Sequence, residues 1–375
     1  MNTQTLKKTA LNDTCRKYGG KMVDFHGWEL PIQFEGITKE HSAVRNGAGM
    51  FDVSHMGQIF VTGKDAAAFL DYVNANDVKK LQNNQGCYSH LPNGRKGIVD
   101  DVINFCLDQA GGRYLVIVNA TTSSKDYEWF LGNSSGFDVK IENRSDDYSM
   151  IALQGPKTIE IMKRFEPVIL KFGRFCIVES SFKGEKTFVS RTGYTGEDGF
   201  EVTAPHKVIN EIWEKFAELG KPYGLIPCGL GSRDTLRLES GYLLYGNDID
   251  DEHTTYEANY GWVVKLKKEK FIGKDIYLKQ KEEGLKVKLT GLATETGIPR
   301  EGCRVFAGGE QIGALQSATY SPTLKKGIGV GYFTKTDLKP GDELEVEIRD
   351  KKVKARVHEV PFHKGTAFGK VYIAQ

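Results

Sequence analysis

The sequence predicts an α+β protein that ends in a small all-β unit, and three patterns support this prediction. Residues 205–219 place Val208, Ile212 and Phe216 on one stripe at helical spacing. Residues 114–118 are a short apolar run, which is typical of a strand covered on both faces. Beyond about residue 285, short strand patterns alternate with glycine and proline turns, so we expect a β-barrel or a β-sandwich there.

Further elements are expected along the chain. Residues 64–81 and 156–165 have apolar side chains at helical spacing. The charged stretch 265–283 is typical of a solvated helix or connector and is the best linker candidate. Residues 343–358 alternate apolar and charged side chains around a turn, which predicts a hairpin whose opposed glutamates and basic residues can pair.

Composition sets broad limits on function. The chain has 375 residues, which favours two or three domains. Its net charge is +2 and it has no strongly basic tract, so we expect no nucleic-acid partner. It lacks an apolar run of about 18 residues and an apolar N-terminal segment, so we expect neither a membrane span nor a secretory signal.

Cysteine and histidine spacing argues against a metal site. The six cysteines form no CxxC pair, and their scattering is typical of reduced core thiols in a cytosolic protein. The eight histidines include no HExxH motif and no close pair. Asp52, Ser54 and His55 lie in one short segment where neighbouring side chains point apart, so a hydrolytic triad is not expected.

Two adjacent carboxylates interrupt an otherwise apolar strand pattern over residues 96–105. Asp100 and Asp101 point to opposite faces of such a strand, so one of them enters a core or a cavity if both faces are covered. A buried, unpaired carboxylate is costly. The pattern allows two interpretations: an Asp pair bonded to nearby backbone amides, or a functional carboxylate.

The segment 191–201 is rich in glycine and acidic residues. It has neither the lysine of a phosphate-binding loop nor the GxGxxG spacing of a dinucleotide site, so nicotinamide and flavin binding have no support. Glu197, Asp198 and Glu201 offer carboxylates that match the planar N–H edge of a pterin or purine. The alternative is a hairpin turn with surface acids.

Residues 229–240 begin with a glycine-rich turn and continue in a helical pattern. Ser232 is expected at the N-cap of this helix. Arg233 then lies near the helix start, where cations are disfavoured, and this broken rule hints at a specific partner for its guanidinium. An ordinary salt bridge is the alternative.

Together these segments resemble the aminomethyltransferase family, the T proteins of the glycine cleavage system. The resemblance runs from Leu6 to about Phe362, and its motifs keep the family order. They are KMVDFHGWELPIQF (21–34), GMFDVSHMG (49–57), CYSHLPNGRKGIVDD (87–101), ALQGP (152–156), RTGYTGEDGFE (191–201), SRDTLRLESG (232–241), LYGNDID (244–250), GWVVKL (261–266) and SPTLKKGIGVGY (321–332).

The resemblance implies three domains around a central channel that holds folate. The first is a split folate-binding α+β domain over 1–50 and 140–270. The second is an α+β domain over 51–139 that contains the Asp pair, and the third is a C-terminal β-barrel over 280–375. Because the resemblance begins near Leu6, it leaves no room for a transit peptide, and a cytoplasmic location is expected.

Positions within the family motifs imply the site residues. Asp101 resembles the essential carboxylate, Glu201 the residue that grips the pterin ring, and Arg233 a further folate contact. An ordinary Asp pKa of about 3.9 favours orientation and electrostatic stabilisation by Asp101 over proton abstraction. The other positions that line the family site are Tyr88, Asn119 and Trp262.

Two positions depart from a simple match. Lys96 stands where the family usually has a glycine before the Asp pair, which places an extra cation near the site. A basic or aromatic residue near the C-terminus contacts the ligand in family members, and residues 361–368 offer several candidates without a unique alignment.

The resemblance implies a folate-dependent one-carbon transferase. Its substrate is the aminomethyl group on the lipoyl arm of the H protein, and its products are ammonia, 5,10-methylenetetrahydrofolate and the reduced H protein. Tetrahydrofolate is the co-substrate, and no metal, flavin or pyridoxal phosphate is expected. The alternatives are a folate-dependent demethylase and a non-catalytic folate-binding protein of the same superfamily.

Overall fold

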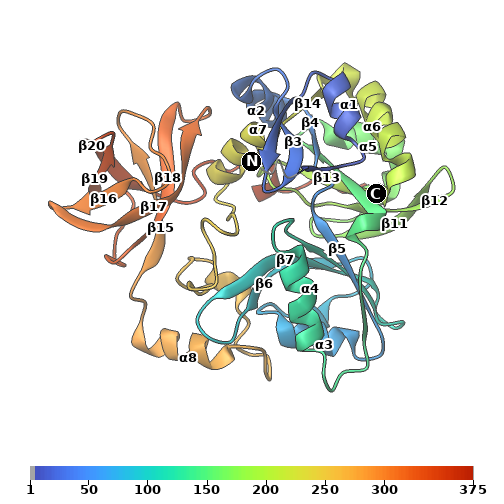
Figure 1. Ribbon diagram of the computed structural model, residues 1–375, viewed down its shortest axis with the longest axis horizontal. Coiled ribbons are helices and arrows are strands. Elements are labelled where there is room, and N and C mark those ends of the chain that lie inside the picture. The colour runs from blue at the N-terminus through green and yellow to red at the C-terminus, as the bar shows by residue number, and fades with distance from the viewer. Residues whose placement is uncertain (1–4, 375) are drawn as a thin grey trace.

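The computed structural model describes residues 5–374, and its strands form three open sheets and one closed barrel (Figure 1). This mixture of helices and sheets with a six-stranded C-terminal barrel confirms the predicted fold class. In Figure 1 the barrel lies at the left, the six-stranded sheet at the upper right and the five-stranded sheet below. None of the helices in the described chain is both long enough and apolar enough to span a bilayer.

The six-stranded sheet joins early and central parts of the sequence. Helices α5 (Thr158–Phe165) and α6 (His206–Gly220) pack on it, and the predicted stripe of α6 is buried. Its strand order is β11-β12-β13-β10-β4-β14. The strand bounds are β4 Gly49–Asp52, β10 Tyr148–Gln154, β11 Ile177–Phe182, β12 Glu185–Ser190, β13 Gly199–Pro205 and β14 Ile226–Pro227.

A small three-stranded sheet lies beside helices α2 and α7. Its order is β1-β3-β2, with β3 in the centre, and α7 contacts both β3 and α2. The bounds are β1 Lys7–Lys8, β2 Lys21–Phe25, β3 Trp28–Gln33, α1 Asn12–Lys17, α2 Ile37–Asn46 and α7 Leu230–Glu239. This group of elements brings the glycine-rich start of α7 against the N-terminal part of the chain.

The five-stranded sheet has the order β6-β7-β8-β5-β9 and contains the Asp pair on β7. Residues 114–118 on β8 are all buried, which confirms the prediction of a covered strand. The bounds are β5 Gly57–Thr62, β6 Gly86–Pro92, β7 Ile98–Asp108, β8 Arg113–Val118, β9 Lys140–Asn143, α3 Ala66–Val73 and α4 Ser123–Gly132.

The C-terminal strands close into a barrel of order β15-β18-β17-β16-β19-β20. The predicted hairpin is present, and ion pairs across it join Glu343 to Arg356 at 2.9 Å and Glu345 to Lys352 at 3.4 Å. Its tight turn is Arg349 and Asp350, both with positive φ. The bounds are α8 Lys274–Glu283, β15 Lys288–Thr294, β16 Arg304–Ala307, β17 Glu310–Ser321, β18 Lys326–Phe333, β19 Glu343–Ile348 and β20 Lys351–His358.

The predicted helix over residues 64–81 is too long. Helix α3 ends at Val73, and Asn74 adopts an extended conformation. The Asn74 side-chain amide donates to the Leu70 carbonyl oxygen at 2.8 Å, so it replaces the backbone donor that a further helical turn would supply.

The predicted solvated character of residues 265–283 holds for α8 apart from the buried Tyr277, and it is wrong for Lys268. Its ammonium is buried and donates to the carbonyl oxygens of Asp71, Asn74 and Asn76 at 2.5, 2.7 and 2.8 Å. A lysine in a charged stretch thus caps the chain that leaves α3, a tertiary contact that charge patterning does not reveal.

The sheets also show where the expected domain boundaries differ from strand pairing. Strand β4 extends to Asp52 within the six-stranded sheet, beyond the expected boundary at residue 50. Strand β9 pairs with β5 in the five-stranded sheet, beyond the expected boundary at residue 139. Strand pairing therefore places each of these two domain boundaries a few residues closer to the C-terminus than expected.

Candidate active site

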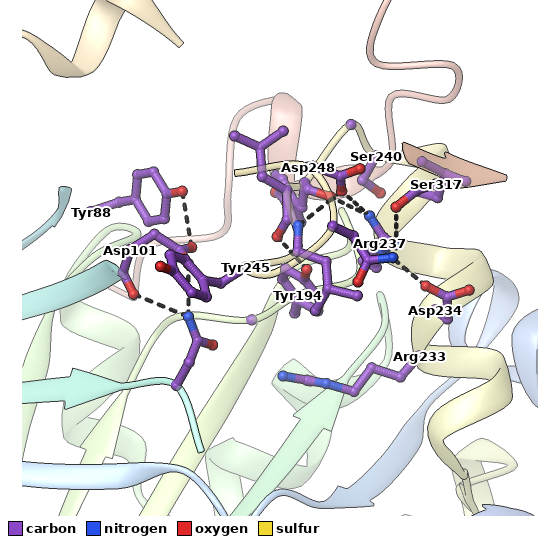
Figure 2. Close-up of a pocket in the computed structure, with 18 of the residues that line it drawn as sticks. Tyr88, Asp101, Tyr194, Arg233, Asp234, Arg237, Ser240, Tyr245, Asp248 and Ser317 are labelled. Carbon is purple, nitrogen blue, oxygen red and sulfur yellow. Dashed lines mark hydrogen bonds and ion pairs between the residues drawn. The ribbon is translucent and has the colours of Figure 1, made fainter. Parts of the chain in front are cut away.

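A cavity of about 900 Å³ lies between the six-stranded sheet, the five-stranded sheet, helix α7 and the barrel. Figure 2 shows Tyr88 and Asp101 at one side of this cavity and Arg233 at the other. The structure thus brings together side chains from distant parts of the sequence. All six predicted site residues line the cavity, namely Tyr88, Asp101, Asn119, Glu201, Arg233 and Trp262.

Strand β7 turns Asp101 into the cavity and Asp100 to the opposite, fully covered face. The Tyr88 hydroxyl on the neighbouring strand β6 donates to Asp101 Oδ2 at 3.0 Å. The Asn119 side-chain amide, just after β8, donates to Asp101 Oδ1 at 2.7 Å. Both carboxylate oxygens are therefore fixed by donors, and the carboxylate remains at the cavity surface.

Asp100 is buried and fits the interpretation as a carboxylate that is bonded to nearby backbone amides. It accepts hydrogen bonds from the Asn119 backbone amide at 3.1 Å and from the Thr122 hydroxyl at 2.8 Å. The Asn119 side-chain amide, which also serves Asp101, lies 2.9 Å from Asp100 Oδ1. Asn119 thus ties the two carboxylates to each other and fixes their relative placement.

Asp126 on α4 is a third carboxyl group in this region, and sequence analysis missed it. Burial and the charge of Asp100 raise the pKa of Asp126 well above its ordinary value. Neither Asp126 oxygen has a donor among the described side chains and backbone, so an ionised form would be unpaired. A neutral Asp126 removes the repulsion between its carboxyl group and the Asp100 charge.

Burial first, and then the charge of Asp100, raise the pKa of Asp101 to about 7. Hydrogen bonds from Tyr88 and Asn119 oppose this shift because they stabilise the ionised form. At neutral pH the carboxyl group therefore exists in both protonation states. This changes the expectation from an ordinary Asp pKa, since Asp101 can exchange a proton as well as orient a substrate.

The three acidic side chains of the glycine-rich segment are all buried, so the interpretation as a turn with surface acids is wrong. Glu197 is buried and forms an ion pair with Arg45 at 2.9 Å. Asp198 is buried and forms an ion pair with Arg191 at 2.5 Å. These two acids hold the chain together, so only Glu201 is left to line the cavity.

Glu201 lies on β13 with one oxygen bound and the other open to the cavity. The Thr192 hydroxyl donates to its Oε2, whereas Oε1 accepts no hydrogen bond from residues 5–374. Burial raises the pKa of Glu201, and the Thr192 bond and the Arg233 charge oppose this shift. An acceptor oxygen is thus available to a ligand that carries N–H groups.

The start of helix α7 differs from the prediction, because Gly229 rather than Ser232 is the N-cap. Ser232 lies within the first turn, where its hydroxyl donates to Glu40 Oε2 at 3.1 Å. The Gly229 amide donates to the same oxygen at 2.9 Å. A carboxylate from α2 thus takes the place of a local cap, which a local sequence pattern does not reveal.

Arg233 has no ordinary salt bridge within the described chain, so that alternative is wrong. Its guanidinium lies 4.7 Å from the Tyr194 ring centroid, and its buried Nη1 has no hydrogen-bond partner. Arg237, one turn later, is paired with Asp234 and Asp248 at 2.8 and 2.5 Å. Of the two arginines, Arg233 is the one with a nitrogen still available to a ligand.

Trp262 lies at the rim of the cavity and is 56% exposed. Its ring stacks on Tyr88 with the centroids 6.0 Å apart. Lys96, the departure from the family motif, lies 3.3 Å from Glu257 and does not line the cavity. The extra cation predicted beside the Asp pair is therefore paired with Glu257 and leaves the carboxylates undisturbed.

An aromatic stack on the cavity wall was missed by the sequence analysis. The Tyr194 and Tyr242 ring centroids lie 5.9 Å apart, and those of Tyr242 and Phe368 lie 6.2 Å apart. Tyr194 belongs to the glycine-rich segment, and Phe368 belongs to the C-terminal stretch that could not be aligned. Phe368 is thus an aromatic C-terminal residue that reaches the site.

The structure confirms that Asp52, Ser54 and His55 form no triad. Asp52 accepts from the Thr9 hydroxyl at 2.6 Å, and the Ser54 hydroxyl bonds the Met150 carbonyl oxygen at 3.3 Å. The buried His55 Nδ1 has no partner within the described residues. Among residues 5–374 there is also no group of three His, Cys, Asp or Glu side chains placed to hold a metal ion.

A cavity of this size with an oriented carboxylate at one side and an unpaired arginine at the other is typical of a site that binds and orients a small-molecule ligand. Residues 11–268 match the family model described as the GCVT N-terminal domain. Residues 288–364 match the model described as the glycine cleavage T-protein C-terminal barrel domain. The chain belongs to the glycine cleavage T-protein family.

Relatives of similar length support this assignment. The aminomethyltransferase of Thermoanaerobacter pseudethanolicus is 46% identical over 96% of this chain and 98% of its own. The aminomethyltransferase of Bacillus subtilis is 44% identical over 96% of this chain and 99% of its own. The crystal structure of the glycine cleavage system aminomethyltransferase T of Bartonella henselae superposes with a TM-score of 0.88, at 32% identity, over 96% of this chain and 99% of that one.

Proposed function

We propose that this protein transfers the methylene carbon of an aminomethyl group on the lipoyl arm of H protein to tetrahydrofolate. The products are 5,10-methylenetetrahydrofolate, ammonia and dihydrolipoyl H protein. The observation that carries this proposal is Asp101, a carboxylate with both oxygens fixed by donors that faces the cavity. The family names favour this activity over a demethylase or a non-catalytic folate-binding protein.

The reaction needs orientation, charge stabilisation and two proton movements. The methylene carbon loses its bonds to nitrogen and sulfur and gains bonds to two folate nitrogens. The protons of those nitrogens end on the released ammonia and on the thiolate of the lipoyl arm. Ionised Asp101 accepts the N–H of the attacking amine and stabilises positive charge on the carbon. Its raised pKa also lets it take that proton and pass it on.

Glu201 and Arg233 are the proposed contacts of the folate. The open Glu201 oxygen suits the N–H edge of a pterin ring, and the unpaired Arg233 nitrogen suits a carbonyl or carboxylate of the same ligand. Asn119 and Tyr88 hold Asp101, and Trp262 forms the rim beside them. Tetrahydrofolate supplies the two nucleophilic nitrogens when bound.

Lipoylated H protein is the proposed macromolecular partner, and the cytoplasm is the proposed location. We also propose the division into a split first domain, a second domain with the Asp pair and a C-terminal barrel. The split and the barrel agree with the separate sheets, although two boundaries shift to include β4 and β9. The carrier must visit other enzymes, so we expect a small, transient interface.

A transfer assay tests the proposed function. Chemically aminomethylated H protein and tetrahydrofolate are mixed with the protein, and methylenetetrahydrofolate and ammonia are measured together. Equal amounts of both products, absent without the protein, are expected. Tight folate binding without turnover would instead indicate the non-catalytic protein, and turnover of methylated sulfur or nitrogen donors alone would indicate the demethylase.

A further inference from the structure

A chain of buried hydrogen bonds continues from Asp101 into the protein, behind the wall of the cavity. The Tyr88 hydroxyl, which donates to Asp101 Oδ2, also lies 2.9 Å from His90 Nε2. The other ring nitrogen, Nδ1, lies 2.9 Å from the Thr255 hydroxyl. That hydroxyl lies 3.0 Å from the hydroxyl of Tyr277. Four side chains thus form a continuous line that ends on one carboxylate.

The members of this line come from three separate parts of the chain. Tyr88 and His90 lie on β6, Thr255 lies in the long connection after α7, and Tyr277 lies on α8. His90 and Thr255 are 0% exposed and Tyr277 is 2% exposed. None of these last three lines the cavity. A polar group buried this deeply needs a hydrogen-bond partner, and here each partner is the next member of the line.

One arrangement of hydrogens satisfies the line while Asp101 is ionised. The carboxylate only accepts, so Tyr88 donates its single hydrogen to it. The Tyr88 oxygen then accepts from His90, whose hydrogen must lie on Nε2, and Nδ1 accepts from Thr255. Burial lowers the pKa of His90 to about 3, so the ring is neutral, as this arrangement requires.

We propose that His90 is a positioning residue for aminomethyl transfer, which holds the Tyr88 hydroxyl as a fixed donor to Asp101. Thr255 sets the tautomer of the ring, and Tyr277 supplies the donor to Thr255. The inference rests on the proposed function and deepens it, because it assigns the orientation of the reacting carboxylate to residues outside the cavity.

The pH dependence of the reaction should report this role. A donor to the ionised form favours ionisation, so loss of a fixed Tyr88 hydroxyl raises the pKa of Asp101 further. Of the two side chains that donate to Asp101, Tyr88 contacts His90 and Asn119 does not. The polar groups that surround Asp101 are Asp100 on its own strand, Tyr88 on β6, Asn119 after β8, Tyr194 and Tyr260. The groups that surround His90 are Tyr88, Thr255 and the stacked ring of Tyr260.

The test measures kcat for aminomethyl transfer against pH in full-length variants. His90→Leu removes both ring nitrogens, and we expect kcat to fall about tenfold, the equivalent of one oriented hydrogen bond to a charged group. We also expect the acid limb of the profile to move to higher pH. His90→Gln can direct an amide N–H at Tyr88 and should recover most of kcat and the original acid limb.

Thr255→Val keeps the imidazole and removes only its donor. It should change kcat and the acid limb in the same direction by less, and its effect should not add to that of His90→Leu. The matched control is Tyr256→Phe, because the Tyr256 ring packs 5.3 Å from that of Tyr277 and its hydroxyl is not in the line. The control should match the wild-type protein in rate and profile.

The outcomes separate this inference from the proposed function. An acid limb at its original pH in both His90→Leu and Thr255→Val, with the wild-type protein active, overturns the positioning role alone. If His90→Leu does not fold, Thr255→Val and His90→Gln decide the question by the same profile. Absence of transfer by the wild-type protein overturns the proposed function, and this inference with it.

Discussion

At the scale of single residues, Asp101 and Asp100 show how position on a strand divides two identical side chains. They are neighbours on β7, yet one faces the cavity and the other is bound by Asn119 and Thr122. Burial and the charge of Asp100 together bring the pKa of Asp101 to about 7. Burial is thus the larger cause of the raised pKa of Asp101, and its neighbour on the strand adds to it.

Glu201→Ala should weaken binding of tetrahydrofolate by about tenfold or more, because hydrogen bonds from the ligand to a buried carboxylate are lost. Direct titration of tetrahydrofolate into the protein, for example by calorimetry, measures this. The matched control is Glu179→Ala on β11 of the same sheet, where the side chain is exposed and should not change affinity. Equal affinity in Glu201→Ala and the control would place the ligand elsewhere.

Asp126→Asn should stabilise the protein at pH 8 and have little effect near pH 4. Because the pKa of Asp126 is raised on folding, its contribution to stability is complete below the unfolded value of about 3.9 and is lost as the pH rises. An asparagine is neutral at every pH and so has no such penalty. Urea unfolding at pH 4 and at pH 8 measures the effect. At pH 8 the free energy of unfolding of Asp126→Asn should exceed that of the wild-type protein by at least about 1.4 kcal/mol, the equivalent of a tenfold change in proton affinity.

The Asp126 prediction has a clear contrary result. A variant that is less stable than the wild-type protein at pH 8, with no change at pH 4, would mean that Asp126 is ionised in the folded protein.

At the scale of elements, Glu40 joins the starts of two helices that are distant in the sequence. One of its oxygens accepts from the backbone amides of Phe34, Glu35 and Gly36 at 2.6, 3.0 and 3.1 Å. The other accepts from Gly229 and Ser232 at the start of α7. The carboxylate is fully buried and holds α7, and with it Arg233, against α2.

Glu40→Ala should lower the free energy of unfolding by about 3 kcal/mol or more, because it leaves several buried donors without an acceptor. Urea denaturation measures the change. The matched control is Glu35→Ala, since the Glu35 side chain forms an exposed ion pair with Lys39 and should contribute about 0–1 kcal/mol. Similar losses in both variants would show that the Glu40 carboxylate is not the link between the helices.

Local patterns predicted the elements that local physics determines. The stripe of α6, the apolar run of β8 and the alternation of the β19–β20 hairpin all follow from which faces must be buried. The end of α3 and the cap of α7 did not follow, because Lys268 and Glu40 reach them from elsewhere in the chain. Caps supplied by distant side chains leave no mark on the local sequence.

At the scale of the whole molecule, the cavity exists only where several elements meet. Arg237 on α7 binds Asp248 in the long connection and Ser317 on the barrel strand β17, so one side chain joins three parts of the wall. The site residues were identified from the resemblance to a family. Residue pattern alone left Asp101, Glu201 and Arg233 each with an alternative, since pattern does not place distant segments side by side. It did not single out Tyr88, Asn119 or Trp262 at all.

Two residues behind the cavity wall were not singled out by the sequence patterns. The sequence patterns did not single out Asp126, and its raised pKa depends on burial and on the nearby charge of Asp100, which only the fold creates. His90 lies within a family motif, but its line to Tyr88 and Thr255 joins β6 to a connection far along the chain. Both residues stand out in the structure because they are buried polar groups, and a buried polar group needs a hydrogen-bond partner.

The measurement to make first is the rate of methylenetetrahydrofolate formation from aminomethylated H protein across pH, for the wild-type protein and Asp101→Asn. In the proposed mechanism the ionised carboxylate of Asp101 is the active form, so the wild-type rate should fall as the pH drops through about 7. Asp101→Asn should bind tetrahydrofolate within a few fold of the wild-type protein and lose about 10²-fold or more in rate at every pH. Near-normal turnover of Asp101→Asn with a wild-type pH profile would contradict the assignment of Asp101 as the reacting carboxylate.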